Sequence, residues 1–144
     1  MNAVELLPHR PPLVLITKGV AIADGEAEAI ADTSENCIFF EHSLGGVPAC
    51  AALEYMAQTM AFAVGDHARR AGEPPKPGFI LGSRHFEVRI PVFRRDEVYR
   101  VHVHCDYTDE QFAAFDCKIA DASGNIVAEG VLTAFQPDAE ELDK

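Results

Sequence analysis

The stretch from residue 45 to residue 70 limits the possible folds most, because it is long, largely apolar and spaced like a helix. Gly45 and Gly46 free the backbone before it, and Pro48 suits a first helical turn, where a missing N–H costs nothing. Largely apolar residues then recur at intervals of three and four positions, which predicts a single helix. One face of this helix consists of Leu53, Met56, Met60, Val64 and His67. Gly72 and the prolines that follow it mark the end of the helix.

Stretches of β-strand character lie on both sides of this helix. One strand is expected before it, over residues 17–31, with a turn or bulge near Asp24 and Gly25. Strands are expected after it at 79–91, 98–107, 111–120 and 126–135, with a hairpin turn at 121–125. A helix that is apolar nearly all round must be buried on most sides. The pattern therefore predicts an α+β fold in which a curved antiparallel sheet wraps around one central helix.

Length and composition indicate an ordinary globular chain. The 144 residues suit one domain, which we place at residues 1–137, followed by an acidic tail at 138–144. Acidic and amide side chains interrupt every apolar run, so we expect no membrane span. We find no signal-peptide core near the first residues. The four cysteines are scattered, which favours free thiols in a reducing cytoplasm.

The charge is unevenly distributed along the chain. A net charge of −11 argues against nucleic acid as the main partner. Residues 69–100 nevertheless carry a net charge of +4, whereas the rest of the chain carries −15. This basic segment, with Arg84, Arg94 and Arg95 as its candidate contacts, is expected to dock an acidic partner or a phosphate. The alternative is that these arginines only protect strand edges from aggregation.

Several motifs, in conserved order along most of the chain, resemble the β-hydroxyacyl-acyl-carrier-protein dehydratases of the hot dog fold. Residues 7–15 read Leu-Pro-His-Arg-Pro-Pro-Leu-Val-Leu, similar to the family's PHR-P-LL segment. Phe-Phe at 39–40, His42 and the Val-Pro to Leu-Glu-Tyr-Met-Ala-Gln stretch at 47–58 resemble its FF-GHFP…E-MAQ segment. Gly-Phe-Ile-Leu-Gly at 78–82 and Ile-Pro-Val at 90–92 resemble G-LLG…RPV.

The helix motif and the final Phe-Gln-Pro at 135–137 resemble most closely the small dehydratase-like proteins associated with aryl polyene synthesis. Two departures from the wider family stand out. The family's Gly-His-Phe-Pro-Gly is Glu-His-Ser-Leu-Gly at 41–45 here, and the loop to the helix is shorter. The family's Pro-Gly at the helix start is Pro48-Ala49 here.

The resemblance implies a hydro-lyase that eliminates water from a carrier-bound 3-hydroxyacyl thioester. It assigns Glu54 as the acid for the leaving hydroxyl and His42 as the base for the α-proton, with the pair drawn from two protomers. The amide of Ala49 or Cys50, at the helix start, would polarise the thioester carbonyl. Further expected contacts to the substrate are Gln58, Met56 and His9. We expect the acyl chain to run along the helix in a tunnel lined by Leu53, Met56, Met60 and phenylalanines.

Each of these residues also has a structural alternative. Glu54 could be a carboxylate bonded to backbone amides, His42 a surface residue, and His9 either a backbone anchor or a substitute base. A Cys50–His42 nucleophile pair is conceivable, although cysteine is also a common small core residue. His85, His102, His104, Cys105 and Cys117 do not form a ligand pattern, so no metal site is expected.

No cofactor is expected, because no phosphate-binding motif is present and the substrate arrives on phosphopantetheine. The expected partners are an acyl carrier protein and a second hot dog chain, in a homodimer, a higher oligomer or a hetero-oligomer. Two other functions stay open: an acyl thioesterase, in which Glu54 activates water, and a catalytically silent partner subunit of a dehydratase complex. The shortened His42 loop motivates the second of these.

Overall fold

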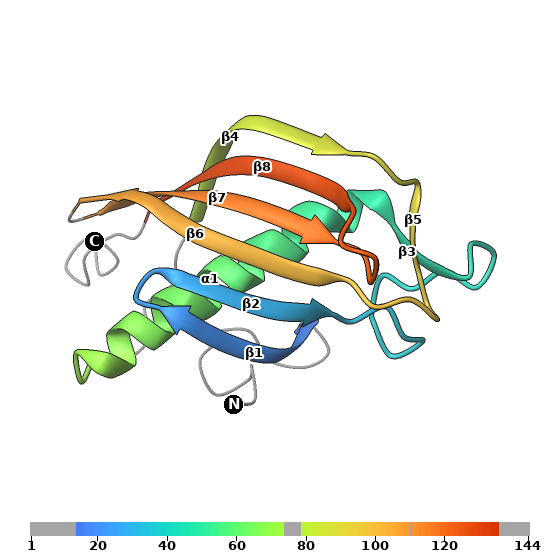
Figure 1. The fold of residues 1–144 in the computed structure, drawn as a ribbon, viewed down its shortest axis with the longest axis horizontal. Coiled ribbons are helices and arrows are strands. Elements are labelled where there is room, and N and C mark those ends of the chain that lie inside the picture. The colour runs from blue at the N-terminus through green and yellow to red at the C-terminus, as the bar shows by residue number, and fades with distance from the viewer. Residues whose placement is uncertain (1–13, 74–78, 110, 136–144) are drawn as a thin grey trace, which may run out of the picture.

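The computed structural model describes residues 14–73, 79–109 and 111–135. One helix, α1 (Ala52–Arg70), follows a short 3-10 turn, η2 (Ala49–Ala51). The main sheet is antiparallel and has six strands in the order β1-β2-β6-β7-β8-β4, and it curves around α1 (Figure 1). Its strands are β1 (Ile16–Ala23), β2 (Glu26–Ala31), β4 (Phe79–Val88), β6 (Arg100–Thr108), β7 (Phe112–Ala120) and β8 (Ile126–Phe135). The α+β architecture predicted from the sequence is confirmed.

The expected strand at 17–31 is in fact two strands. β1 and β2 form a hairpin around Asp24 and Gly25, where the turn or bulge was predicted. Gly25 has a φ of +80°, a conformation that glycine adopts without strain. The predicted turn at 121–125 is confirmed, since the N–H of Asn125 donates to the Asp121 carboxylate at 3.0 Å between β7 and β8. The predicted tail at 138–144 lies outside the described residues.

A small second sheet was missed by the sequence analysis. β3 (Gly46–Pro48) pairs antiparallel with β5 (Val92–Arg94), with Val47 opposite Phe93. A Cβ on Gly46 would lie 2.2 Å from the carbonyl oxygen of Phe93, so only glycine permits this close pairing. This β3–β5 ribbon lies beside the start of the helix (Figure 1). It is too short to show a period-2 pattern, because each strand has three residues.

The apolar helix face identified from residue spacing is only partly buried. α1 packs against β6, β1, β2 and β7 through a stripe that includes Tyr55, Thr59, Phe62 and Asp66. Met56 and Met60 are buried as expected, but Leu53 is 38% exposed and His67 is also exposed. Thr59 and Asp66 are buried instead, because their polar groups are satisfied by neighbouring residues of the helix. α1 is not long and apolar enough to cross a membrane.

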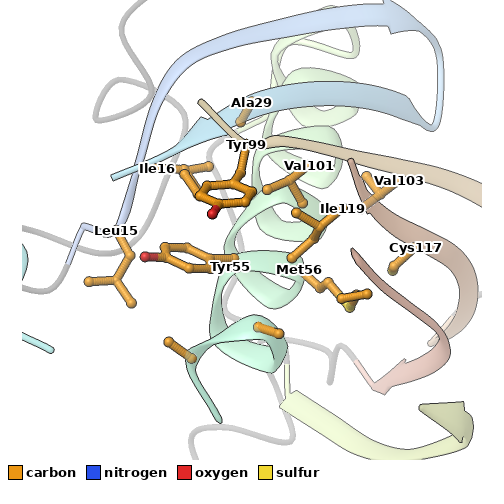
Figure 2. Close-up of a cluster of buried hydrophobic side chains, with 14 of the residues drawn as sticks. Leu15, Ile16, Ala29, Tyr55, Met56, Tyr99, Val101, Val103, Cys117 and Ile119 are labelled. Atoms are coloured by element: carbon orange, nitrogen blue, oxygen red, sulfur yellow. The ribbon is translucent and has the colours of Figure 1, made fainter. Parts of the chain in front are cut away.

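The core lies between α1 and the concave side of the sheet (Figure 2). Side chains from β1, β6 and β7 meet Tyr55 and Met56 of the helix there. Many members are Ala, Val or Cys, which keeps the sheet close to the helix. Tyr99, on the approach to β6, joins the same cluster and brings a hydroxyl group into it.

Candidate functional site

Glu54 lies in the first turn of α1 and is partly buried. A carboxylate at this end of a helix is favoured by the partial positive charge of the free backbone N–H groups. The adjacent residues on α1, Tyr55 and Met56, are both fully buried, so the backbone that carries Glu54 is held by the core. The structure thus presents an acidic side chain from a rigid element, as general acid–base chemistry requires.

Gln58 links this carboxylate to the first strand. Its amide Nε2 donates to Oε1 of Glu54 at 3.2 Å, and its own Oε1 accepts the backbone N–H of Leu15 at 2.7 Å. Gln58 is 0% exposed, and its bond to Leu15 is buried, whereas its bond to Glu54 is only partly buried. This bond fixes the position of Gln58 relative to the Glu54 carboxylate, and the predicted contact of Gln58 with substrate stays a prediction.

His42 lies in a tight turn between Glu41 and Gly46. The N–H of Glu41 donates to the carbonyl of Gly46 at 2.9 Å, and the N–H of Gly45 donates to the carbonyl of Glu41 at 3.1 Å. The His42 ring is exposed and packs edge-on against Phe40, with the ring centroids 5.1 Å apart. Among the described residues of one chain, no contact joins His42 to Glu54. Their pairing, within a chain or across two chains, stays a prediction.

The two amides predicted to polarise the thioester carbonyl lie in the 3-10 turn before α1. The N–H of Ala49 donates to the carbonyl of Pro91 at 3.0 Å, so this amide already has a partner within the fold. Cys50 is in the same 3-10 turn, where backbone N–H groups lack partners further back in the helix. Of the two predicted donors, Cys50 is therefore the better placed.

The thiols differ sharply in their surroundings. All four cysteines are free, as expected. Cys50 is exposed, so it is no core residue in the single chain. Burial raises the pKa of the Cys37 thiol and raises that of Cys117 to about 12, which keeps both protonated and unreactive.

Two of the three predicted docking arginines lie beside the His42 turn. Arg94 pairs with Gly46 across the β3–β5 ribbon, and the N–H of Arg95 donates to the carbonyl of Gly45 at 3.2 Å. Both side chains are exposed, and that of Arg95 forms an ion pair with Glu35. Arg84 is exposed on the edge strand β4. The structure therefore brings positive charge to the same turn that presents His42.

The remaining residues predicted to contact substrate lie either in the core or outside the described residues. Met56 and Met60 belong to the buried core, whereas Leu53 is partly exposed. His9 lies outside the described residues. The tunnel along the helix stays a prediction.

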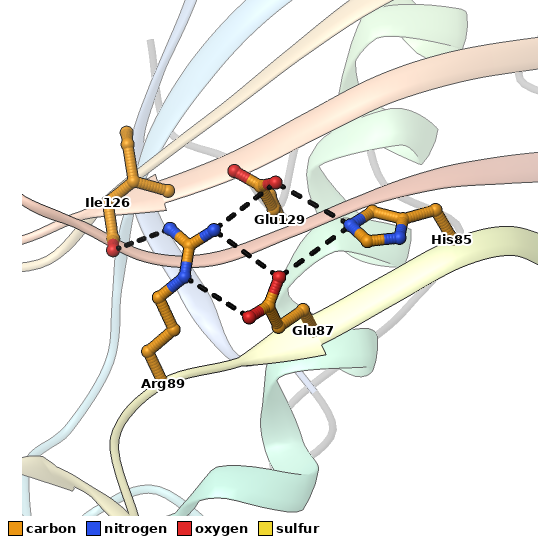
Figure 3. A network of polar contacts seen from close by, with 5 residues as sticks. All are labelled: His85, Glu87, Arg89, Ile126 and Glu129. Carbon is orange, nitrogen blue, oxygen red and sulfur yellow. Dashed lines mark hydrogen bonds and ion pairs between the residues drawn. The ribbon is translucent and has the colours of Figure 1, made fainter.

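A polar network on β4 and β8 contains metal-ligand types (Figure 3). Nε2 of His85 lies 3.8 Å from Glu87 and 3.5 Å from Glu129. The guanidinium of Arg89 already lies 3.3 Å from each of these carboxylates and donates to the carbonyl of Ile126 at 3.2 Å. Arg89 therefore already supplies the positive charge that a bound cation would bring to these carboxylates, and we assign the network to the pairing of these two strands.

Tyr55 and Phe93 were not among the residues predicted for the site. Their rings meet at right angles with centroids 5.3 Å apart, and Phe93 meets Tyr99 in the same way at 5.0 Å. Phe93 lies in a stretch too short for a strand pattern, and Tyr55 appeared only as part of the helix motif. The sequence signal that could have identified Tyr55 was its position directly after Glu54.

Comparison with solved structures finds proteins of similar fold. The structure is similar to the dehydratase heterocomplex ApeI:P from Xenorhabdus doucetiae, with 26% identity and a TM-score of 0.90, over 99% of this chain and 95% of that chain. A hypothetical thioesterase with coenzyme A from Streptococcus pneumoniae is 14% identical, with a TM-score of 0.64 over 83% of this chain and 84% of that chain. A Streptococcus mutans protein bound to acetyl CoA is 10% identical, with a TM-score of 0.67 over 91% and 95%. No curated protein matches.

These likenesses confirm the predicted hot dog fold. The two streptococcal proteins are too different in sequence to indicate more than the fold. The family evidence comes from the whole sequence. The model for ApeP-like proteins, described as ApeP dehydratase, matches residues 1–144, so this chain belongs to the ApeP-like dehydratase family.

Proposed function

We propose that this protein eliminates water from a 3-hydroxyacyl thioester carried on the phosphopantetheine arm of an acyl carrier protein. The observation that supports this most is the Glu54 carboxylate, presented in the first turn of α1 and oriented by Gln58. The Gln58 amide N–H donates to one oxygen of this carboxylate, and the carboxyl group can exchange a proton with a substrate as a general acid. Membership of a dehydratase family supports the same chemistry.

Each residue has a defined role in the elimination. The imidazole of His42 takes the proton from C2, and the electron pair forms the C2–C3 double bond while the C3–O bond breaks. Glu54 donates a proton to the departing hydroxyl, which leaves as water. The amide of Cys50 stabilises the negative charge that develops on the thioester oxygen. The proton on His42 then returns through solvent, so the enzyme regains its starting state.

The partners follow from the same geometry. Arg94 and Arg95 flank the His42 turn, where an acidic carrier protein would deliver its substrate. The edge strand β4 exposes Ile80, Leu81 and Phe86, which a second hot dog chain would cover. Four free thiols fit a reducing compartment such as the cytoplasm.

The test is an isosteric replacement in the purified protein. Glu54→Gln should abolish formation of the enoyl product, and His42→Ala should lower kcat by about two orders of magnitude or more. Glu28→Gln, the same change on β2, is the matched control and should retain wild-type turnover. Wild-type activity in the Glu54 variant contradicts the assignment, and release of free thiol without an enoyl product indicates a thioesterase.

A second candidate function is that of a partner subunit in a dehydratase complex. The similar protein from Xenorhabdus doucetiae is part of a heterocomplex, which favours this alternative. Turnover should then appear only when a second hot dog chain is added. Turnover by the chain alone, lost in Glu54→Gln, would exclude a silent subunit.

A further inference from the structure

Tyr55 connects three parts of the site through one side chain. It follows Glu54 on α1 and is 0% exposed. Its hydroxyl donates to the carbonyl of Asp32 at 2.7 Å, and its ring lies at 90° to that of Phe93. Burial raises the pKa of Tyr55 well above its ordinary value, so the hydroxyl remains a donor throughout the working pH range.

The hydroxyl bond holds the segment that leads into the His42 turn. Asp32 directly follows β2 and begins this segment. The N–H of Cys37 then donates to the carbonyl of Ser34, and the N–H of Phe40 donates to that of Cys37, both at 3.0 Å. The Phe40 ring in turn supports the His42 ring. A continuous set of contacts therefore runs from Tyr55 to one end of the turn.

The ring contact holds the other end of the same turn. Phe93 is fully buried between Tyr55 and Tyr99, and it lies opposite Val47 in the β3–β5 ribbon. Gly46 of this ribbon closes the turn by accepting the N–H of Glu41. Both ends of the His42 turn are thus tied to the residue next to Glu54.

We propose that Tyr55 is a positioning residue, which sets where the His42 turn lies relative to the helix turn of Glu54. The proposal rests on the proposed function, because it assigns Tyr55 to the dehydration site. Tyr55 itself does not contact the reacting atoms. Its hydroxyl donates a hydrogen bond to the Asp32 carbonyl, and its ring packs inside the core (Figure 2).

The test compares two variants that each remove one buried hydroxyl from α1. Tyr55→Phe keeps the ring contact but loses the bond to Asp32. Thr59→Val is the matched control, because its hydroxyl bonds only the helix carbonyl of Tyr55 at 2.9 Å. Tyr55→Phe should lower kcat about tenfold with KM within twofold, since small displacements of a reacting group are costly. Thr59→Val should leave both constants within about twofold.

Two further measurements separate positioning from general stability. The pH–rate profile of Tyr55→Phe should change on the limb that His42→Ala removes, and that of Thr59→Val should not. Hydrogen exchange at the amides of Cys37 and Phe40 should accelerate only in Tyr55→Phe. Equal losses of kcat in both variants, or unchanged kcat and exchange in Tyr55→Phe, would overturn the proposal. If the wild type shows no dehydration in any assembly, the proposed function fails, and the exchange data still decide whether Tyr55 holds the turn.

Discussion

Gln58 bonds the Glu54 carboxylate with its amide N–H while its amide oxygen holds the backbone of Leu15. One buried side chain thus connects the candidate acid to the start of β1. Because an amide has a fixed donor end and a fixed acceptor end, this arrangement allows one orientation of Gln58. The same side chain therefore orients the Glu54 carboxylate and attaches the residue before β1 to the helix.

Substitutions of Gln58 should separate these two tasks. Gln58→Met removes both bonds and leaves the buried Leu15 N–H without its acceptor, which should cost about 1–3 kcal/mol of stability in urea unfolding. Gln58→Glu retains an acceptor for Leu15 but places a second carboxyl beside Glu54. Because neighbouring carboxyls disfavour double ionisation, the limb of its pH–rate profile that depends on the Glu54 carboxyl should move to higher pH. An unchanged profile in Gln58→Glu contradicts the orienting role.

The close pairing at Gly46 should make this residue irreplaceable. Gly46→Ala puts a Cβ 2.2 Å from the Phe93 carbonyl oxygen, so the backbone must separate. We expect a loss of at least about 2 kcal/mol in unfolding free energy. Gly45→Ala is the control: Gly45 has a φ of +66° and open space around it, so only backbone strain of about 1–2 kcal/mol applies. Equal losses in the two variants would show that steric contact in the ribbon is unimportant.

Asp66 should make stability depend on acidic pH. Its carboxylate is 1% exposed. Burial alone would raise its pKa, but hydrogen bonds from Arg69 and Arg70 outweigh burial and hold the pKa below the ordinary 3.8. The carboxylate therefore contributes stability above pH 3.8, and this contribution falls as the pH drops through the lower folded value. Asp66→Asn should lose about 2 kcal/mol at pH 7, because both arginines lose a charged acceptor. The difference from wild type in thermal unfolding should shrink below pH 3.8.

Charge reversal beside the His42 turn should affect carrier recognition. Arg94→Glu is expected to raise KM for a carrier-bound substrate about tenfold with little change in kcat, and added salt should raise the wild-type KM. Lys118→Glu, an equal charge change at an exposed position on β7, should leave KM unaltered. Identical kinetics of Arg94→Glu and wild type on carrier-bound substrate would exclude Arg94 from docking.

Features with strong local signals were predicted well from the sequence. The long helix ending at Arg70, the β7–β8 hairpin and the α+β architecture all follow from periodicity and turn chemistry. The predicted helix start at Pro48 was wrong, because residues 46–48 form β3 and residues 49–51 form a 3-10 turn before α1 begins at Ala52. Glu54 was identified as a candidate because a carboxylate in an apolar helix costs free energy if it is buried without a partner. Features that depend on long-range contacts were not predicted. The β3–β5 ribbon joins residues far apart in sequence, and its strands are too short to show a pattern.

The sequence by itself determined that one apolar helix would be covered by an antiparallel sheet, because helix and strand periods are local properties of the chain. It also pointed to His42 and Glu54 as candidate catalytic residues, through the motifs around them. Only the tertiary structure decided which helix face is buried, since Thr59 and Asp66 satisfy their polar groups within the helix and can enter the core. It alone revealed the hydrogen bonds of Gln58 to Leu15 and of Tyr55 to Asp32, because these bonds exist only after the chain has closed.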